Sequence, residues 1–282
     1  MRQSTPSQPE VVLSTAQHPR LSEYGRLIYP VISRRSGGLS LGINLNPAKN
    51  CNFDCIYCQV DRTIPKKSLK APLKQVLKEL EGWFEEIKKD NGSFKGYPLK
   101  DISIAGDGEP TLYKPLAELI REVLHLKNIH GLKEAKLVLF TNGTRILRDD
   151  LLAVFPEFMK NSGEIWFKLD YWDQESLKRI NRSRCSFKRL IDNLVEVGGR
   201  FPLILQSCFF NWEGTPFETK TYQAYAELIG ELIEKGVLIK HIQIYSLART
   251  PADSRCLPLS GEQIIQVKNL ILDRIEVEIL TF

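Results

Sequence analysis

Short runs of aliphatic and β-branched residues alternate along the chain with longer segments in which apolar residues recur at helical spacing. The clearest helical pattern covers residues 72–89, where Leu73, Val76, Leu80 and Phe84 fall every three or four residues. Further helices are expected over residues 114–126, 174–181, 187–197, 217–235 and 261–272. Strands are expected over residues 39–45, 101–105, 135–140, 164–169, 203–207, 239–245 and 275–280.

This alternation of strands and helices predicts an α/β fold made of parallel βαβ units. Six such units either close partly into a barrel or form an open doubly wound sheet, and the pattern permits both. Both arrangements place the functional loops beyond the carboxyl ends of the strands. We expect one core domain over residues 24–282, preceded by a polar, flexible extension over residues 1–23.

Composition and charge describe an ordinary globular protein. Of the 282 residues, 43% are hydrophobic, and 39 basic side chains against 34 acidic ones give a net charge of +5. This mild excess permits an anionic partner such as RNA without requiring one. The first ten residues are polar and precede no apolar run, and no apolar stretch is long enough to span a membrane. We therefore expect a cytoplasmic protein with no membrane partner, whose cysteines stay reduced.

Three of the 6 cysteines, Cys51, Cys55 and Cys58, lie within eight residues and directly follow the first expected strand. Soft thiolate ligands select iron–sulfur clusters, zinc or cuprous ion. A structural zinc site uses four protein ligands, and no fourth cysteine or histidine is near in the sequence. A set of three thiolates leaves one metal position open, which suits catalysis.

The spacing C-x3-C-x2-C, with the aromatic Tyr57 before the last cysteine, resembles the signature of the radical S-adenosylmethionine (SAM) superfamily. The resemblance implies a partial (β/α)6 TIM-like barrel in which Cys51, Cys55 and Cys58 hold a [4Fe–4S] cluster. It also implies that the open iron binds SAM, whose reductive cleavage yields methionine and a 5′-deoxyadenosyl radical. Tyr57 would pack near the adenine, or would cover the cluster as an apolar lid.

A glycine-rich segment follows the second expected strand and resembles the GGEP motif of the same superfamily, with Asp107 where glycine is common. Small residues allow close backbone approach, and carbonyls together with a carboxylate accept hydrogen bonds from an ammonium group. The resemblance implies that this segment binds the amino group of SAM, whereas an ordinary strand-to-helix turn is the alternative. The residues concerned are Gly106, Asp107, Gly108, Glu109 and Pro110.

Polar residues at other strand ends are further candidates for cofactor binding. Asn142 belongs to a Thr-Asn-Gly turn after the third strand, and Gln206 is a polar residue in the otherwise apolar fifth strand. Asp170 closes the fourth strand on the same side as Lys168, by the two-residue period of a strand. Asp170 would bind ribose hydroxyls or substrate, or would form an ion pair with Lys168.

Two longer segments resemble a subgroup of the superfamily described as wyosine-synthase-related iron–sulfur oxidoreductases. The first consists of Tyr29–Arg35 and Ser40–Asn44 and the second is Gln243–Ala252, so the resemblance spans about residues 24–260. Ser36-Gly37-Gly38 departs from the pattern, because many relatives carry leucine and glycine after the two arginines. The subgroup is a weak guide to the substrate.

The remaining basic residues and cysteines leave alternatives open. Six basic residues cluster after the fourth strand, and Arg34 and Arg35 precede the first. One of these arginines would hold the carboxylate of the cofactor, or the set would follow an RNA backbone or form a solvated helix face. The six are Lys178, Arg179, Arg182, Arg184, Lys188 and Arg189. Cys185, Cys208 and Cys256 would hold an auxiliary cluster or act as small buried hydrophobes, and their isolation in sequence favours the second.

The sequence therefore predicts a radical SAM enzyme that abstracts hydrogen from an unidentified substrate, with a tRNA base favoured over a peptide. A low-potential electron donor such as flavodoxin or ferredoxin is the implied partner. The alternative is a non-catalytic iron–sulfur or zinc-binding protein in electron transfer or assembly. The segment from Gly106 to Pro110 separates the two, because a protein that only holds metal needs no site for an ammonium-bearing ligand.

Overall fold

A curved, mostly parallel sheet organises the chain in a computed structural model that describes residues 26–60, 62 and 70–282. The sheet order is β1-β2-β4-β5-β6-β7-β9-β11, with β3 paired to β4. Its strands are β1 (Ile28–Ser33), β2 (Gly38–Ile43), β3 (Ser93–Phe94), β4 (Tyr97–Ile104), β5 (Lys136–Thr141), β6 (Gly163–Lys168), β7 (Leu203–Cys208), β9 (Ile239–Tyr245) and β11 (Ile279–Thr281). A separate ribbon pairs β8 (Asn211–Trp212) with β10 (Cys256–Leu257).

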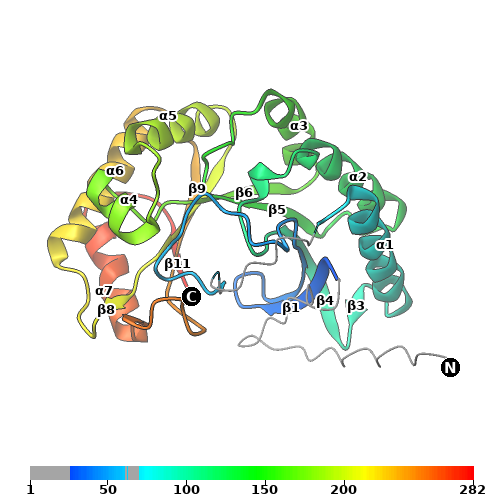
Figure 1. Ribbon diagram of the computed structural model, residues 1–282, viewed down its shortest axis with the longest axis horizontal. Helices are drawn as coiled ribbons and strands as arrows, with labels where there is room; N and C mark the ends of the chain where they lie inside the picture. The colour runs from blue at the N-terminus through cyan, green and yellow to red at the C-terminus, as the bar shows by residue number, and fades with distance from the viewer. Residues whose placement is uncertain (1–25, 61, 63–69) are drawn as a thin grey trace.

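Helices cover the outer, convex side of this sheet (Figure 1). They are α1 (Leu73–Lys89), α2 (Leu116–Ile129), α3 (Asp149–Lys160), α4 (Gln174–Asn181), α5 (Phe187–Gly198), α6 (Thr219–Glu234) and α7 (Gly261–Leu272), with a 3-10 turn, η2, over Pro110–Leu112. The sheet curls into a half-barrel, and the segment that follows β2 passes across its concave side (Figure 1). The prediction of an α/β domain with a partial barrel is therefore confirmed.

Because side chains alternate along each strand, one set packs into the main core under the helices and the other set lies on the inner face of the half-barrel. On β5, Leu137 and Leu139 point outward into the main core beneath the helices and are fully buried. Val138, between them, points inward and packs with Trp166 and Ile204 from β6 and β7. The inner face thus has a small apolar cluster of its own, separate from the main core under the helices.

The predicted helices and strands all occur, with ends that differ by a few residues, but several elements were not predicted from the sequence. No strand was predicted before residue 39, whereas β1 pairs antiparallel with β2 in a hairpin. No helix was predicted between the third and fourth predicted strands, where α3 contains Pro156. Proline removes a helical hydrogen bond, and four buried apolar residues compensate here. These residues are Leu151, Val154, Phe155 and Phe158. The short strands β3, β8 and β10 were also missed.

Two expectations about the ends of the chain remain predictions. The proposed extension over residues 1–23, and the start of the core domain at residue 24, lie outside the described residues. Among the helices that the structure describes, none combines the length and apolar character needed to cross a bilayer.

Because β5 lies in the middle of the sheet, truncation of a buried side chain on this strand should lower the free energy of unfolding substantially. Leu139→Ala should lower the free energy of unfolding by about 2–5 kcal/mol, because Leu139 is fully buried between sheet and helices. Leu238→Ala is a matched control, since its side chain is 49% exposed, and a change within about 0.5 kcal/mol is expected. Denaturant unfolding of both variants measures the difference, and equal costs would contradict this description of the core.

Candidate functional site

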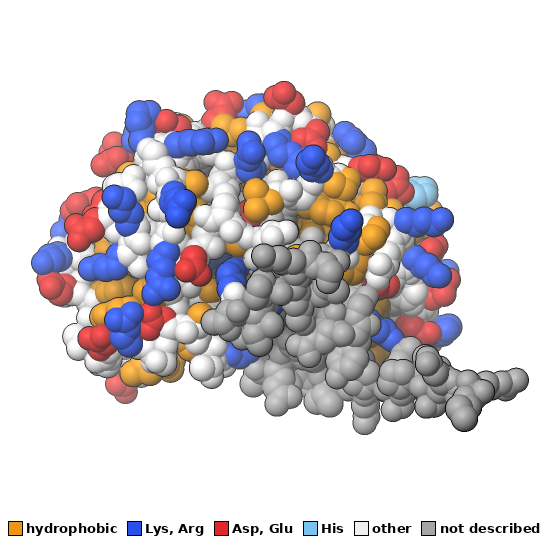
Figure 2. All heavy atoms as spheres, viewed as in Figure 1, with side chains coloured by type: hydrophobic (Ala, Val, Ile, Leu, Met, Phe, Trp, Pro, Cys, Tyr) orange, Lys and Arg blue, Asp and Glu red, His pale blue; other side chains and the backbone are white. Residues whose placement is uncertain are grey.

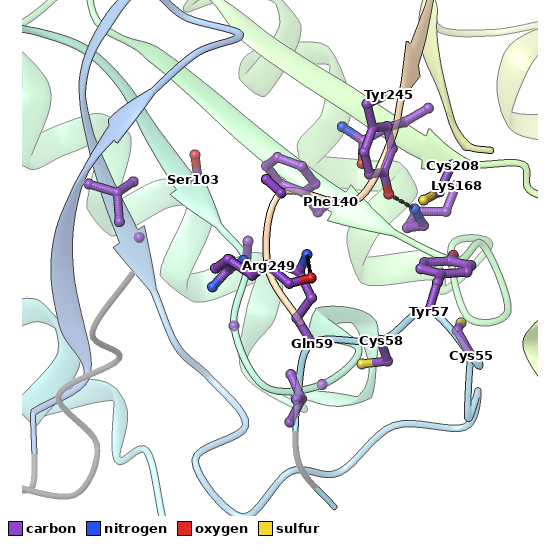
Figure 3. A pocket seen from close by; sticks show the side chains of 18 of the residues that line it. Cys55, Tyr57, Cys58, Gln59, Ser103, Phe140, Lys168, Cys208, Tyr245 and Arg249 are labelled. Atoms are coloured by element: carbon purple, nitrogen blue, oxygen red, sulfur yellow. Dashed lines mark hydrogen bonds between the residues drawn. The ribbon is translucent and has the colours of Figure 1, made fainter. Parts of the chain in front are cut away.

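A cavity of about 330 Å³ opens inside the half-barrel at the carboxyl ends of the strands. This volume lies in the range of small-molecule sites. Its lining includes the three clustered cysteines and most of the predicted cofactor residues: Cys51, Cys55, Tyr57, Cys58, Gly106, Gly108, Glu109, Pro110, Asn142 and Gln206. Figure 3 shows Cys55, Tyr57 and Cys58 on one side of the cavity and Phe140 and Tyr245 on another. The site residues predicted from sequence therefore mostly face one common space.

The cysteine-bearing segment is held in place through its backbone. The amide of Ile56 donates to the carbonyl of Ile180 at 2.9 Å, next to the end of α4. The amide of Ala252 donates to the carbonyl of Cys58 at 2.7 Å. These bonds tie the segment to two elements far along the chain, so the cysteines sit on a fixed path although they belong to no helix or strand.

The three cysteine side chains are partly buried and reduced. Burial raises the pKa of Cys51 to about 11 and that of Cys55 to about 12, so both are neutral thiols at pH 7 when no metal is bound. Asn181 Nδ2 donates to Cys55 Sγ at 3.2 Å, and Arg62 Nη1 donates to Cys58 Sγ at 3.0 Å. These two donors would stabilise the thiolate forms that ligate metals.

The thiols face the same cavity but are not gathered around one point. Within the described residues, no three Cys, His, Asp or Glu side chains are close enough together to share a metal ion. Cys185, Cys208 and Cys256 do not form such a group either. Cys208 and Cys256 are buried in an apolar cluster that also contains Tyr57 and Phe210, which is the packing role considered for them.

The glycine-rich loop after β4 lies against the start of the cysteine segment. The amide of Glu109 donates to the carbonyl of Asn50 at 3.1 Å, one residue before Cys51. A Cβ atom added at Gly108 would lie 1.8 Å from that same carbonyl oxygen. Glycine is therefore required at residue 108, because any side chain would push the two loops apart.

Glu109 is buried and is already hydrogen-bonded inside the protein. One carboxylate oxygen accepts from the Thr111 amide and hydroxyl and from the Thr141 hydroxyl, at 2.6–3.1 Å. The other accepts from the Asn142 amide at 2.8 Å. Burial raises the pKa of Glu109 and these donors lower it, with a net rise. Glu109 thus joins the loop after β4 to the end of β5, in addition to facing the cavity.

Asn142 connects this loop pair to the cysteine segment. Its side-chain amide donates to Asn52 Oδ1 at 2.8 Å, and Asn52 Nδ2 donates to the Thr144 hydroxyl at 2.6 Å. Asn52 lies directly after Cys51 in the chain. Asn142 therefore positions the first cysteine while lining the cavity.

Asp107 and Asp170 are not among the residues that line the cavity. Asp107 pairs with Asn44 at the end of β2, whose side-chain amide donates to it at 2.7 Å. Asp170 forms an ion pair with Lys168 at 3.3 Å, which is the alternative considered for it. Both carboxylates serve the framework of the site in this arrangement.

Tyr57 is fixed by Asp170, to which its hydroxyl donates a hydrogen bond. Burial, reinforced by Asp170, raises the pKa of Tyr57, so the phenol stays protonated. The ring of Tyr57 lies 5.2 Å from Lys168 Nζ. Burial opposes the charge on Lys168, but Asp170 and Tyr245 raise its pKa overall. Tyr57 is thereby held with one face towards the cavity.

Gln206, on β7, lines the cavity, and its side-chain amide donates to Gln243 Oε1 at 3.2 Å. Residues that the sequence analysis missed are Arg62, Asn181 and Asn52, which contact the cysteines or the segment that carries them. The sequence carries little signal for these three residues, because each is a single polar residue outside a motif and contacts the cysteine segment only in the folded chain.

Gly108→Ala should separate the cysteine segment from the loop after β4. The backbone carbonyl of Asn50 cannot move aside as a flexible side chain would, so we expect a cost of about 1–3 kcal/mol. Hydrogen exchange at the Glu109 amide, which is bonded to Asn50, should accelerate. Gly82→Ala on α1 is the control, because no atom lies within 4 Å of its added Cβ. Unchanged protection at Glu109 would show that the two loops do not depend on each other.

Comparisons with known proteins identify a family for this chain. Residues 45–205 match the Radical SAM superfamily model. A UPF0026 protein of Helicobacter pylori is 29% identical over 178 residues, 63% of this chain and 52% of that protein. A UPF0026 protein of Methanocaldococcus jannaschii is 33% identical over 153 residues, 54% of this chain and 43% of that protein. The matches thus span about half the length of these relatives.

Among solved structures, archaeal TYW1 aligns over 90% of this chain and 76% of its own, with 14% identity and a TM-score of 0.46. The superfamily match covers more than half of the chain, from the end of β2 to β7, and includes the three cysteines and the glycine-rich loop. The chain belongs to the Radical SAM superfamily.

Proposed function

We propose that this protein binds a [4Fe–4S] cluster through Cys51, Cys55 and Cys58 and uses it to cleave SAM reductively. The cluster, when bound by these cysteines, would supply the electron that cleaves SAM to methionine and a 5′-deoxyadenosyl radical, which would abstract a hydrogen atom from the substrate. The observation that carries the proposal is that all three thiols line the same cavity as Gly106, Gly108, Glu109 and Pro110 of the glycine-rich loop.

The donor set fits a cluster in chemistry. Three cysteines on one segment supply soft sulfur ligands, and proximity to iron would lower the pKa of their thiols. Arg62 and Asn181 each donate to a cysteine sulfur, and such donors stabilise thiolate charge. Binding would require the three sulfurs to converge on the cubane from their positions around the cavity.

The loop after β4 offers a site for the amino group of SAM. Gly106 and Gly108 have no side chains, so their backbone lines the cavity directly. Glu109 faces the same space and retains acceptor capacity on the oxygen that is bonded only to the Asn142 amide. Around it, Tyr57 offers a flat, rigid ring, and Gln206 offers a side-chain amide. These residues would orient the cofactor and exclude water from it.

We propose a tRNA base as the substrate in preference to a peptide side chain. Lys178, Arg179, Arg184 and Arg189 are exposed on or beside α4 and α5. Figure 2 shows Lys and Arg side chains over the α4 and α5 side of the face that is drawn, with acidic groups between them. Arg182 is committed to an ion pair with Asp253 at 3.0 Å. Exposed basic residues of this kind support contact with the phosphates of a nucleic acid.

Reconstituted protein should release 5′-deoxyadenosine under anaerobic conditions with dithionite and SAM. Cys55→Ser should abolish the product and lower bound iron, because it removes one of the three ligands. Cys185→Ser is the matched control, since Cys185 is half-buried and lies outside the cavity, and it should keep both iron and product. Stoichiometric zinc without iron in oxygen-free preparations would instead favour a non-catalytic metal protein.

Binding of unmodified tRNA should weaken with rising salt if the α4–α5 surface contacts phosphates. Lys178→Gln, Arg179→Gln and Arg184→Gln combined should reduce the slope of log K against log salt by about 3, one for each lost contact. Lys74→Gln, Lys78→Gln and Lys88→Gln on α1 provide a variant with the same change in charge. An equal loss in both variants would mean that only net charge matters, and the assigned surface would be wrong.

A further inference from the structure

The end of the cavity lined by Phe140 and Tyr245 contains a guanidinium enclosed by aromatic rings. Arg35 lies in the turn between β1 and β2 and lines the cavity. Its guanidinium carbon is 4.7 Å from the ring centre of Tyr245 and 5.9 Å from those of Phe140 and Trp166. Phe140 and Tyr245 lie apart from Cys55 and Cys58 in Figure 3, so this region is distinct from the cysteine end.

Arg35 forms no hydrogen bond or ion pair with any residue in the described part of the chain. The neighbouring charges of the inner face are already paired. Asp101 accepts hydrogen bonds from three serine hydroxyls, those of Ser36, Ser40 and Ser103. Lys168 pairs with Asp170. The Arg35 guanidinium therefore keeps its five donor protons available on the cavity side.

A second acidic group on the inner face is also unavailable to Arg35. Glu164 binds Lys136 and Lys240, each at 2.9 Å, and accepts from the indole nitrogen of Trp166 at 3.0 Å. The aromatic rings stabilise the cation of Arg35 but cannot accept its hydrogen bonds in the guanidinium plane. Burial lowers the pKa of Arg35, opposed mainly by Tyr245. A partly buried cation without an acceptor costs stability, and such a cost indicates a role in ligand binding.

The described part of the cavity lining has a positive charge balance. Among the described residues it contains five basic side chains and one acidic side chain, and the acidic one, Glu109, is hydrogen-bonded internally. The basic ones are Arg34, Arg35, Arg62, Lys168 and Arg249. Low-dielectric walls strengthen this field inside the cavity. An anionic group would be attracted to it, and Arg35 offers the planar donor fork that oxyanions match.

We propose that Arg35 binds an oxyanion of the substrate, a phosphate or a carboxylate, at the end of the cavity formed by Phe140 and Tyr245. The inference rests on the proposed function and defines its substrate class: a molecule with an anionic group that enters the half-barrel. A phosphate is the group that a nucleotide would supply, and a carboxylate is the group that an acidic peptide or small acid would supply. Arg35 is a binding residue and takes no part in bond breaking.

Binding to the cluster-free protein tests the proposal directly. Calorimetric titration with phenyl phosphate and with benzoate should show binding of at least one, and neutral benzyl alcohol should not bind. Arg35→Gln should weaken the binding of the anion by about tenfold to a hundredfold, which is the range expected for the loss of a hydrogen bond to a charged group. Arg121→Gln is the matched control, because Arg121 is exposed on α2 outside the cavity. Tighter binding of phenyl phosphate would indicate a nucleotide as the source of the oxyanion, and tighter binding of benzoate would indicate a carboxylic acid.

Thermal unfolding separates binding from folding. Arg35→Met fills the aromatic enclosure without the charge, so its midpoint without ligand should equal or exceed that of the unsubstituted protein. Phenyl phosphate or benzoate should raise the midpoint of the unsubstituted protein and not that of Arg35→Met. The proposal is overturned if neither anion binds, or if Arg35→Gln and Arg121→Gln bind the anion equally well.

The inference and the proposed function can fail separately. In reconstituted protein, Arg35→Gln should bind SAM as tightly as the unsubstituted protein and form 5′-deoxyadenosine in the absence of substrate. If Arg35→Gln weakens the binding of SAM as much as the binding of the anionic probes, Arg35 binds the cofactor and the inference is wrong. If no variant forms 5′-deoxyadenosine while Arg35-dependent anion binding persists, the proposed function is wrong and the anion site stands.

Discussion

One buried carboxylate holds the site together. Glu109 accepts hydrogen bonds from the 3-10 turn that follows it and from the end of β5, while its amide is bonded to the residue before Cys51. Three chain segments that are distant in sequence therefore meet at one residue. A buried carboxylate is favourable only with such partners, so the same bonds that satisfy Glu109 fix the relative positions of the cysteine segment and the loop after β4.

The alternation of the strands explains why this arrangement belongs to the inner face. Residues of one parity, such as Leu139 and Ile244, pack under the helices and hold the half-barrel in shape. Residues of the other parity, such as Gln206 and Tyr245, face the cavity. The shape of the sheet and the chemistry of the site are thus carried by separate sets of side chains on the same strands.

Much of this could be predicted from the sequence, for physical reasons that differ between elements. Helix α1 was predicted closely because its apolar residues repeat at helical spacing over a long stretch. The cysteines and the glycine-rich loop were found because their spacing is local. By contrast, α3 was missed, and it contains Pro156. The environment of Arg35 depends on rings from β5, β6 and β9, which no local pattern brings together.

The hairpin of β1 and β2 allows the lining of the cavity to change without a change in the sheet. Its turn residues, Arg34 and Arg35, line the cavity from a turn between two strands, whereas Gln206 on β7 lies between hydrogen-bonded strands on both sides. Substitution of a few turn residues would change the charge and the depth of the cavity at the end where Arg35 lies, without repacking a strand. Members of one lineage could thus acquire new specificities at this hairpin while the cysteine segment and its chemistry stay untouched.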